Sequence, residues 1–170
     1  MRGDPKVIQL LNGILRNELT AINQYFLHSR QLNHWGVTKL GEYEYKESIA
    51  EMKHADELIE RVLFLGGLPN LQDLDKLLIG ENVKEVLECD LKAELKALDD
   101  LREAIAYTES VRDYASRDLL QEILDHEEES IDFVEIQLDL IGRIGIVIVN
   151  IGGSFQWSFR NNYLHISPHI

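Results

Sequence analysis

The segment that decides the fold is ESIAEMKHAD, residues 47–56. It lies within a longer stretch, from about Lys39 to Leu65, in which apolar residues recur with the spacing of one side of an α-helix. Residues three positions apart share a helix face, so Glu51 and His54 can bind one metal ion together. This pair is common by itself, so it indicates a metal site only if other helices place further ligands beside it.

Three further helices are predicted around this segment. The first begins at Asp4, an N-cap residue followed by proline, and ends near Gly36. The third and fourth are predicted over residues 83–110 and 114–141. The connection over residues 67–82 is long for a compact helical protein, which favours a crossover over a tight hairpin. These features predict an all-α protein, a ferritin-like four-helix bundle with one long crossover between helices two and three.

Composition narrows the class of protein. The chain has 170 residues and a net charge of −13, which disfavours binding to nucleic acid phosphates. Such a charge suits either cations or simple solubility, and charge alone does not choose between them. The single cysteine, Cys89, excludes an intramolecular disulfide. Because no apolar run has the length of a signal peptide or a bilayer span, we expect a cytoplasmic protein without membrane contact.

Each predicted helix places a glutamate within its apolar stripe. These residues, with the histidine that accompanies one of them, are Glu18, Glu51, His54, Glu94 and Glu127. A buried carboxylate is costly unless it is paired or binds a metal ion. One Glu from each of two helices and Glu-x-x-His from each of the other two is the ligand pattern of ferritin-like di-iron proteins. Glu51 and Glu127 are expected to bridge two ions, and the others to be terminal ligands.

The pattern fails at one position of the fourth helix. Ser130 stands where Glu-x-x-His requires histidine, and serine is a weak ligand for iron. His126 lies one turn earlier, displaced by about 6 Å along the helix axis. We expect His126 to be a solvated helix histidine, with its use as a substitute ligand as the alternative. Three other glutamates are also expected to be solvated: Glu47, Glu60 and Glu109.

Several segments resemble one known family. NELTAINQYFLH (residues 17–28), ESIAEMKHAD, GLPNLQ (67–72) and LREAI (101–105) are similar to segments of bacterioferritins. The resemblance covers residues 1–145 and implies a 24-subunit shell that stores a ferric mineral and binds haem b between pairs of subunits. Met52 matches the family's axial methionine, one from each subunit across a twofold axis. Without the resemblance, Met52 is interpreted as core packing.

The chain also departs from the family. Besides Ser130, the positions that differ along the iron route are Lys46, Ala50, Gly66 and Phe133. Residues 146–170 form an atypical tail in place of the family's short fifth helix. The tail is β-branched and aromatic, so we expect it to pack against a partner chain or to be poorly ordered. The predicted organisation is therefore a bundle over residues 1–145 followed by this tail.

Two functions are compatible with this pattern. The first is a haem-bearing storage subunit with an incomplete di-iron site, in a homo-oligomer or in a mixed 24-mer with a ferroxidase-competent subunit. An electron-donating ferredoxin would then dock near Leu68, Asn70, Lys76, Leu77 and Glu81. The alternative is a fully active ferroxidase, in which the five remaining ligands suffice with water or His126. Two further hypotheses fit the pattern less well: a di-iron oxygenase, and a shell protein that handles no iron.

Overall fold

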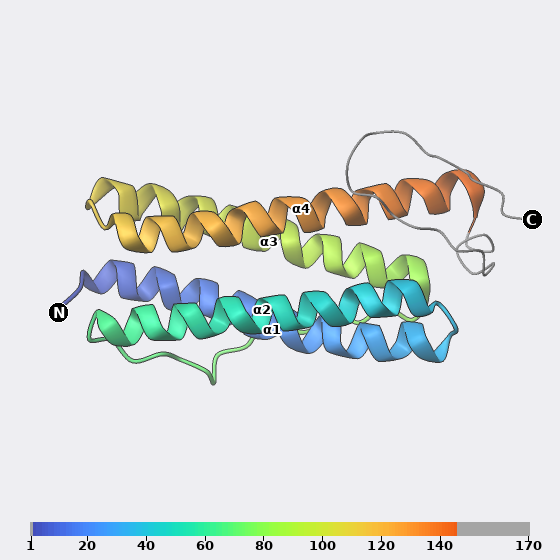
Figure 1. The fold of residues 1–170 in the computed structure, drawn as a ribbon, viewed down its shortest axis with the longest axis horizontal. Coiled ribbons are helices and arrows are strands. Elements are labelled where there is room, and N and C mark those ends of the chain that lie inside the picture. The colour runs from blue at the N-terminus through green and yellow to red at the C-terminus, as the bar shows by residue number, and fades with distance from the viewer. Residues whose placement is uncertain (1, 146–170) are drawn as a thin grey trace, which may run out of the picture.

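The computed structural model describes residues 2–145, which form four α-helices. Their bounds are α1, Pro5–His34; α2, Thr38–Phe64; α3, Val83–Ser110; and α4, Tyr114–Ile144. Figure 1 shows two helical hairpins, α1 with α2 and α3 with α4, lying side by side as a bundle. The connection from α2 to α3 runs along the bundle from one end to the other. The predicted all-α bundle with one long crossover is confirmed, whereas the predicted tail lies outside the described residues.

The helix ends follow from local chemistry. At the start of α1, the Asp4 carboxylate accepts hydrogen bonds from the backbone N–H groups of Lys6 and Val7, at 2.7 and 3.2 Å. Gly36 follows α1 with φ of 81°, and Gly66 follows α2 with φ of 77°. Glycine is favoured in this left-handed conformation because it has no Cβ atom. These two glycines therefore end their helices where the sequence predicts.

Helix α4 runs three residues beyond its predicted end at Ile141. Ile141 is buried in an apolar cluster with Leu32 of α1, so packing favours continued helix in a segment of low helix propensity. The helix ends at Ile144, and Gly145 follows with φ of 75°. Residues 142–144 are exposed, so Gly145 with its positive φ, a local signal, sets this end.

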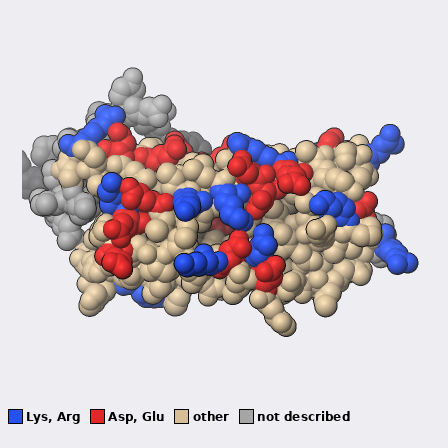
Figure 2. Space-filling model, turned by 180° about the vertical axis from the view of Figure 1, so that it is seen from behind, with Lys and Arg blue, Asp and Glu red and all other residues tan. Residues whose placement is uncertain are grey.

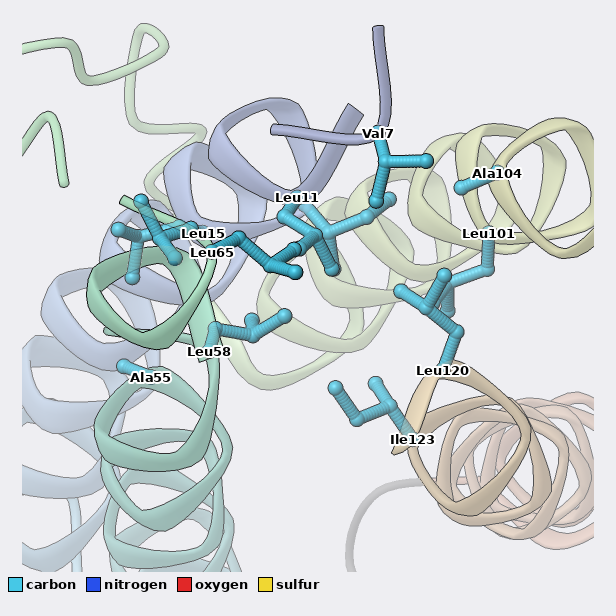
Figure 3. Packing of buried hydrophobic residues seen from close by; sticks show 12 residues of the cluster. Val7, Leu11, Leu15, Ala55, Leu58, Leu65, Leu101, Ala104, Leu120 and Ile123 are labelled. Carbon is cyan, nitrogen blue, oxygen red and sulfur yellow. The ribbon is translucent and has the colours of Figure 1, made fainter. Parts of the chain in front are cut away.

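Two apolar clusters hold the helices together. In the first, side chains from all four helices point into a common interior, as Figure 3 shows for Leu11, Leu58, Leu101 and Leu120. The second lies toward the other end of the bundle and includes Leu32. Burial of such side chains stabilises the fold by roughly 1.5–3 kcal/mol each. The middle section of the bundle, between the clusters, is left for polar side chains.

Side chains of α1 fix the crossover in place. Gln24 Oε1 accepts a hydrogen bond from the backbone N–H of Leu78 at 2.9 Å, and His28 Nε2 accepts one from Gly80 at 3.1 Å. Thr20, one turn before Gln24, accepts a backbone hydrogen bond from the same segment. Residues four apart lie on one helix face, so this stripe of α1 binds an irregular segment that lacks the regular backbone hydrogen bonds of a helix.

The same network reaches α3 through Asp90. His28 Nδ1 lies 2.8 Å from Asp90 Oδ1, and both side chains are fully buried. Because Nε2 of His28 accepts from Gly80, Nδ1 carries the proton and donates it to Asp90. Gln24 Nε2 donates to the same carboxylate at 2.8 Å. One buried imidazole thus joins α1, the crossover and α3.

The exposed surface mixes both signs of charge. Figure 2 shows Lys and Arg interleaved with Asp and Glu over the face seen from behind, rather than one acidic patch. Ion pairs such as Lys96 with Asp75, at 3.0 Å, join α3 to the crossover. Within residues 2–145, no helix combines the length and apolarity needed to cross a bilayer.

Replacing His28 with leucine should loosen the crossover. The change leaves the Gly80 N–H and one Asp90 oxygen buried without these partners, at about 1–3 kcal/mol for each group. Hydrogen exchange at the Gly80 amide should accelerate at least about tenfold, by the same energies. His34→Leu, at an exposed position of α1, is the matched control. Equal exchange at Gly80 in both variants would contradict this role of His28.

Candidate metal centre

The middle section of the bundle buries the four carboxylates that the sequence singles out. Glu18 of α1, Glu51 of α2, Glu94 of α3 and Glu127 of α4 are each at most 3% exposed. The apolar clusters on either side bring these positions of the four helices to the same depth. One carboxylate from each helix therefore reaches a common interior.

Most of the predicted ligands lie within reach of one ion. One ligand atom each from Glu18, Glu51, His54 and Glu127 lies within 4.8 Å of all the others. His54 Nδ1 is 3.1 Å from Glu51 Oε2 and 3.3 Å from Glu18 Oε2. Two ligands at about 2 Å from a shared ion are separated by at most about 4 Å, so small movements suffice to bind a cation. Glu94 lies outside this set but interacts electrostatically with Glu18.

Burial makes these carboxylates hard to ionise. It raises the pKa of Glu18 and of Glu94 to about 8, and the pKa of Glu51 and of Glu127 well above the ordinary value. Repulsion between neighbouring carboxylates adds to the effect of burial at Glu18, Glu51 and Glu127. Several of their oxygens have no hydrogen-bond partner among the described residues: Glu51 Oε1, Glu94 Oε1 and Glu127 Oε2. A multivalent cation would offset both costs.

Ser130 occupies the interior beside Glu94. Its side chain is buried, and its hydroxyl hydrogen-bonds the Glu94 carboxyl. The Tyr43 hydroxyl lies 3.3 Å from Ser130 Oγ, and the Tyr43 ring stacks on Phe133 with centroids 3.8 Å apart. An α4 hydroxyl thus stands among the carboxylates at the position where the ligand pattern requires an imidazole.

The expectation that His126 is a solvated histidine is wrong. Its side chain is 28% exposed and its ring meets that of His54 edge-on, with centroids 4.9 Å apart. Burial lowers the pKa of His126, and His54 lowers it further. Position 126 lies where α4 faces α2. The apolar periodicity of a single helix does not predict this contact between helices.

The expectation that Glu47 is solvated is also wrong. It is buried beside His126, and burial raises the pKa of Glu47 to about 7 while His54 acts in the opposite direction. By contrast, Glu60 and Glu109 are exposed as expected. The sequence analysis therefore missed Glu47 and His126 at the edge of the centre. Each lies one helical turn before a predicted ligand position, Glu51 or Ser130, and this spacing could have indicated them.

A cavity adjoins the centre on one side. It has a volume of ≈ 140 Å³ and lies between α1, α3 and the crossover. Glu18, Glu94 and Glu127 line it, together with crossover residues that include Asp75. Three of the four central glutamates therefore border this cavity.

Met52 lies away from the centre, on the outer face of α2. Its side chain is 51% exposed, so the interpretation of Met52 as core packing is wrong. Tyr45 and Ile49, also exposed, lie on the same side of the helix at positions seven and three before it. Arg30 lies over the rings of both Tyr45 and Phe26, at 5.1 and 5.0 Å from their centroids, which places exposed Phe26 of α1 beside Tyr45. We name Phe26, Tyr45, Ile49 and Met52 the Met52 patch.

A four-helix bundle with buried carboxylates and imidazole at its centre defines a ferritin-like metal-binding protein. Consistent with this, a family model described as a ferritin-like domain matches residues 8–144. The chain is 52% identical to a bacterioferritin of Brucella melitensis over 145 residues, covering 85% of this chain and 90% of the relative. A bacterioferritin of Rhodobacter capsulatus is 49% identical over the same shares, and one of Mycolicibacterium paratuberculosis is 44% identical over 86% and 92%. The chain belongs to the bacterioferritin family.

The buried carboxylates predict how the stability of the metal-free protein depends on pH. Folded Glu18 and Glu94 keep their protons up to a pKa of about 8, whereas the unfolded chain releases them near 4.5. The free energy of unfolding should therefore fall as pH rises from about 4.5 through 8, by up to about 1.4 kcal/mol per unit for each group. Denaturant unfolding of chelator-treated protein measures this slope.

Glu94→Gln should flatten that slope, because glutamine has no proton to lose. Glu109→Gln, at an exposed position, is the matched control and should leave the slope unchanged. If wild type and Glu94→Gln lose stability in parallel between pH 5 and 8, the raised pKa of Glu94 is refuted.

Proposed function

We propose that this chain is an iron-storage subunit of a cytoplasmic 24-subunit shell that binds haem b through Met52 at a twofold interface. Membership of the bacterioferritin family supports the storage role. The observation that carries the haem proposal is the half-exposed thioether of Met52. A haem bound there would supply one-electron transfer to the stored iron.

The residues around Met52 fit a flat, apolar cofactor. The Met52 patch presents two aromatic rings and an aliphatic side chain to the outside. Such a patch is costly in water and suits a partner surface or an apolar ligand. On a twofold axis one methionine from each subunit would provide both axial ligands. Thioether ligation favours ferrous haem and raises its potential, which suits electron transfer.

Met52→Leu should abolish haem binding while the shell still assembles, because leucine keeps the apolar volume without a ligand atom. The Soret absorbance per chain measures haem, and size-exclusion chromatography measures assembly. Met52→His should restore haem with a shifted spectrum, since imidazole also ligates haem iron. Full haem occupancy in Met52→Leu would refute the assignment of Met52 as the haem ligand.

We further propose that iron oxidation by this chain is impaired. Glu18, Glu51, His54 and Glu127 can hold one iron ion, but an ion beside Glu94 meets the Ser130 hydroxyl instead of an imidazole. Iron here is the substrate: reduction of dioxygen to peroxide takes two electrons, and each iron(II) supplies one, so a site that holds two ions together favours the reaction. The incomplete site supports a shell in which a ferroxidase-competent subunit accompanies this chain, with a homo-oligomer as the alternative.

An electron-donor ferredoxin is the proposed partner for iron release. Its docking positions, Leu68, Asn70, Lys76, Leu77 and Glu81, all lie on the crossover, where Leu68 is 82% exposed. The crossover is fixed by the buried His28 network, so it offers a defined surface rather than a loose loop.

Ser130→His should raise the initial rate of iron(II) oxidation by about tenfold or more, in line with the effect of groups that tune a metal site. Ferric absorbance after oxygen is added to anaerobically loaded protein measures the rate. Ser130→Ala, which removes the hydroxyl without adding a ligand, is the control. Its rate should stay near that of the natural chain.

Full ferroxidase activity is the second candidate function. The proximity of His126 to Glu51 and His54 favours it, because an imidazole from α4 is then within reach of the centre after all. Equal rates in the natural chain and Ser130→His would support this candidate and refute the impaired site.

A further inference from the structure

His126 places its two ring nitrogens against two different carboxylates. Nδ1 lies 3.9 Å from Glu51 Oε1, and Nε2 lies 3.6 Å from Glu47 Oε2. Nδ1 of His126 and Oε1 of Glu51 are both buried, and neither has a hydrogen-bond partner among residues 2–145. One ligand atom each from Glu51, His54 and His126 lies within 4.8 Å of the other two.

These distances are those of ligands that face a common cation. Nitrogen and oxygen ligands lie about 2.0–2.2 Å from zinc, so two of them at a tetrahedral angle are separated by roughly 3.4 Å. The 3.9 Å between His126 Nδ1 and Glu51 Oε1 is close to this value. A cation between them would give both atoms the partner that the polypeptide does not provide.

Glu47 completes the arrangement on the far side of the imidazole. A histidine that ligates a metal through one nitrogen commonly directs its other N–H at a carboxylate, which fixes the ring. Glu47 has this position relative to Nε2 of His126. It is therefore suited to orient His126 rather than to bind the ion.

We propose that His126 and Glu51 form a second cation site beside His54, whose Nδ1 belongs to the first ligand set; the site is specific for a divalent transition metal ion and oriented by Glu47. Glu51 links it to the first ligand set, because its Oε2 faces His54 Nδ1, which Glu18 also faces, while its Oε1 faces His126. Imidazole nitrogen selects such metals over magnesium or calcium. The natural ion is iron(II) insofar as the proposed storage function holds.

This site does not replace the missing imidazole at Ser130. Glu94 hydrogen-bonds Ser130, which lies about 6 Å further along α4 than His126. The new site lies between α2 and α4, whereas the ≈ 140 Å³ cavity lies between α1, α3 and the crossover. The centre thus has ligands for a cation on its α2–α4 side, away from the cavity. An ion that crosses the bundle would bind there transiently.

The test is an anaerobic titration of the assembled full-length protein with Co²⁺. Its visible absorption reports coordination by nitrogen and oxygen, and equilibrium dialysis counts bound ions. His126→Asn should bind one Co²⁺ fewer per chain than the natural protein and keep the ion held with Glu18. His34→Asn, which removes an exposed imidazole, is the matched control and should bind as the natural protein does.

Three further variants assign the ions. Glu18→Gln should lose the first ion and keep the one that depends on His126, whereas Glu51→Gln should weaken both. Glu47→Gln should weaken the His126-dependent ion by about tenfold, the effect expected for a group that orients a ligand. His126→Gln serves in place of His126→Asn if the latter does not assemble.

Equal Co²⁺ stoichiometry and affinity in the natural protein and the His126 variant would overturn the proposal. That outcome leaves the storage function standing if the Glu18-dependent ion is still bound. Conversely, absence of the Glu18-dependent ion with retention of the His126-dependent one would contradict the proposed iron centre and uphold this site. Because haem also absorbs in the visible range, the ion count from equilibrium dialysis decides both results.

Discussion

The structure depends on the burial of four carboxylates at one level of a helical bundle. Glu18, Glu51, Glu94 and Glu127 lie in an interior where ionisation is opposed both by burial and, for three of them, by one another. Either protons or cations must therefore occupy them. The two apolar clusters supply the free energy that holds the helices around this unfavourable section.

The rest of the architecture serves this centre. Helix α1 carries Glu18 on one stripe and, on a neighbouring stripe, the side chains Gln24 and His28 that fix the crossover. The long connection lets α2 and α3 run in the same direction (Figure 1). The outer face of α2 is left free for the Met52 patch, which separates the proposed haem from the proposed iron site by the thickness of one helix.

Local signals in the sequence predicted what depends on single helices. Glycines in the left-handed conformation end α1 and α2 where expected, and the apolar periodicity placed the four glutamates in the interior. The signals did not predict what depends on how helices meet. His126 and Glu47 lie where α4 faces α2. Met52 lies in an apolar pattern yet faces outward, and only the family resemblance anticipated a role for it.

If the buried carboxylates bind cations, added metal should stabilise the folded protein, and thermal unfolding of the metal-free assembled protein measures this effect. Zn²⁺ avoids redox chemistry, and at about a hundred times its dissociation constant a ligand stabilises the folded state by about 2.7 kcal/mol. Zn²⁺ should raise the unfolding midpoint of the natural protein, and Glu51→Gln should lose most of this gain although its metal-free form is the more stable one. An equal response of both proteins to Zn²⁺ would show that the buried carboxylates do not bind the cation.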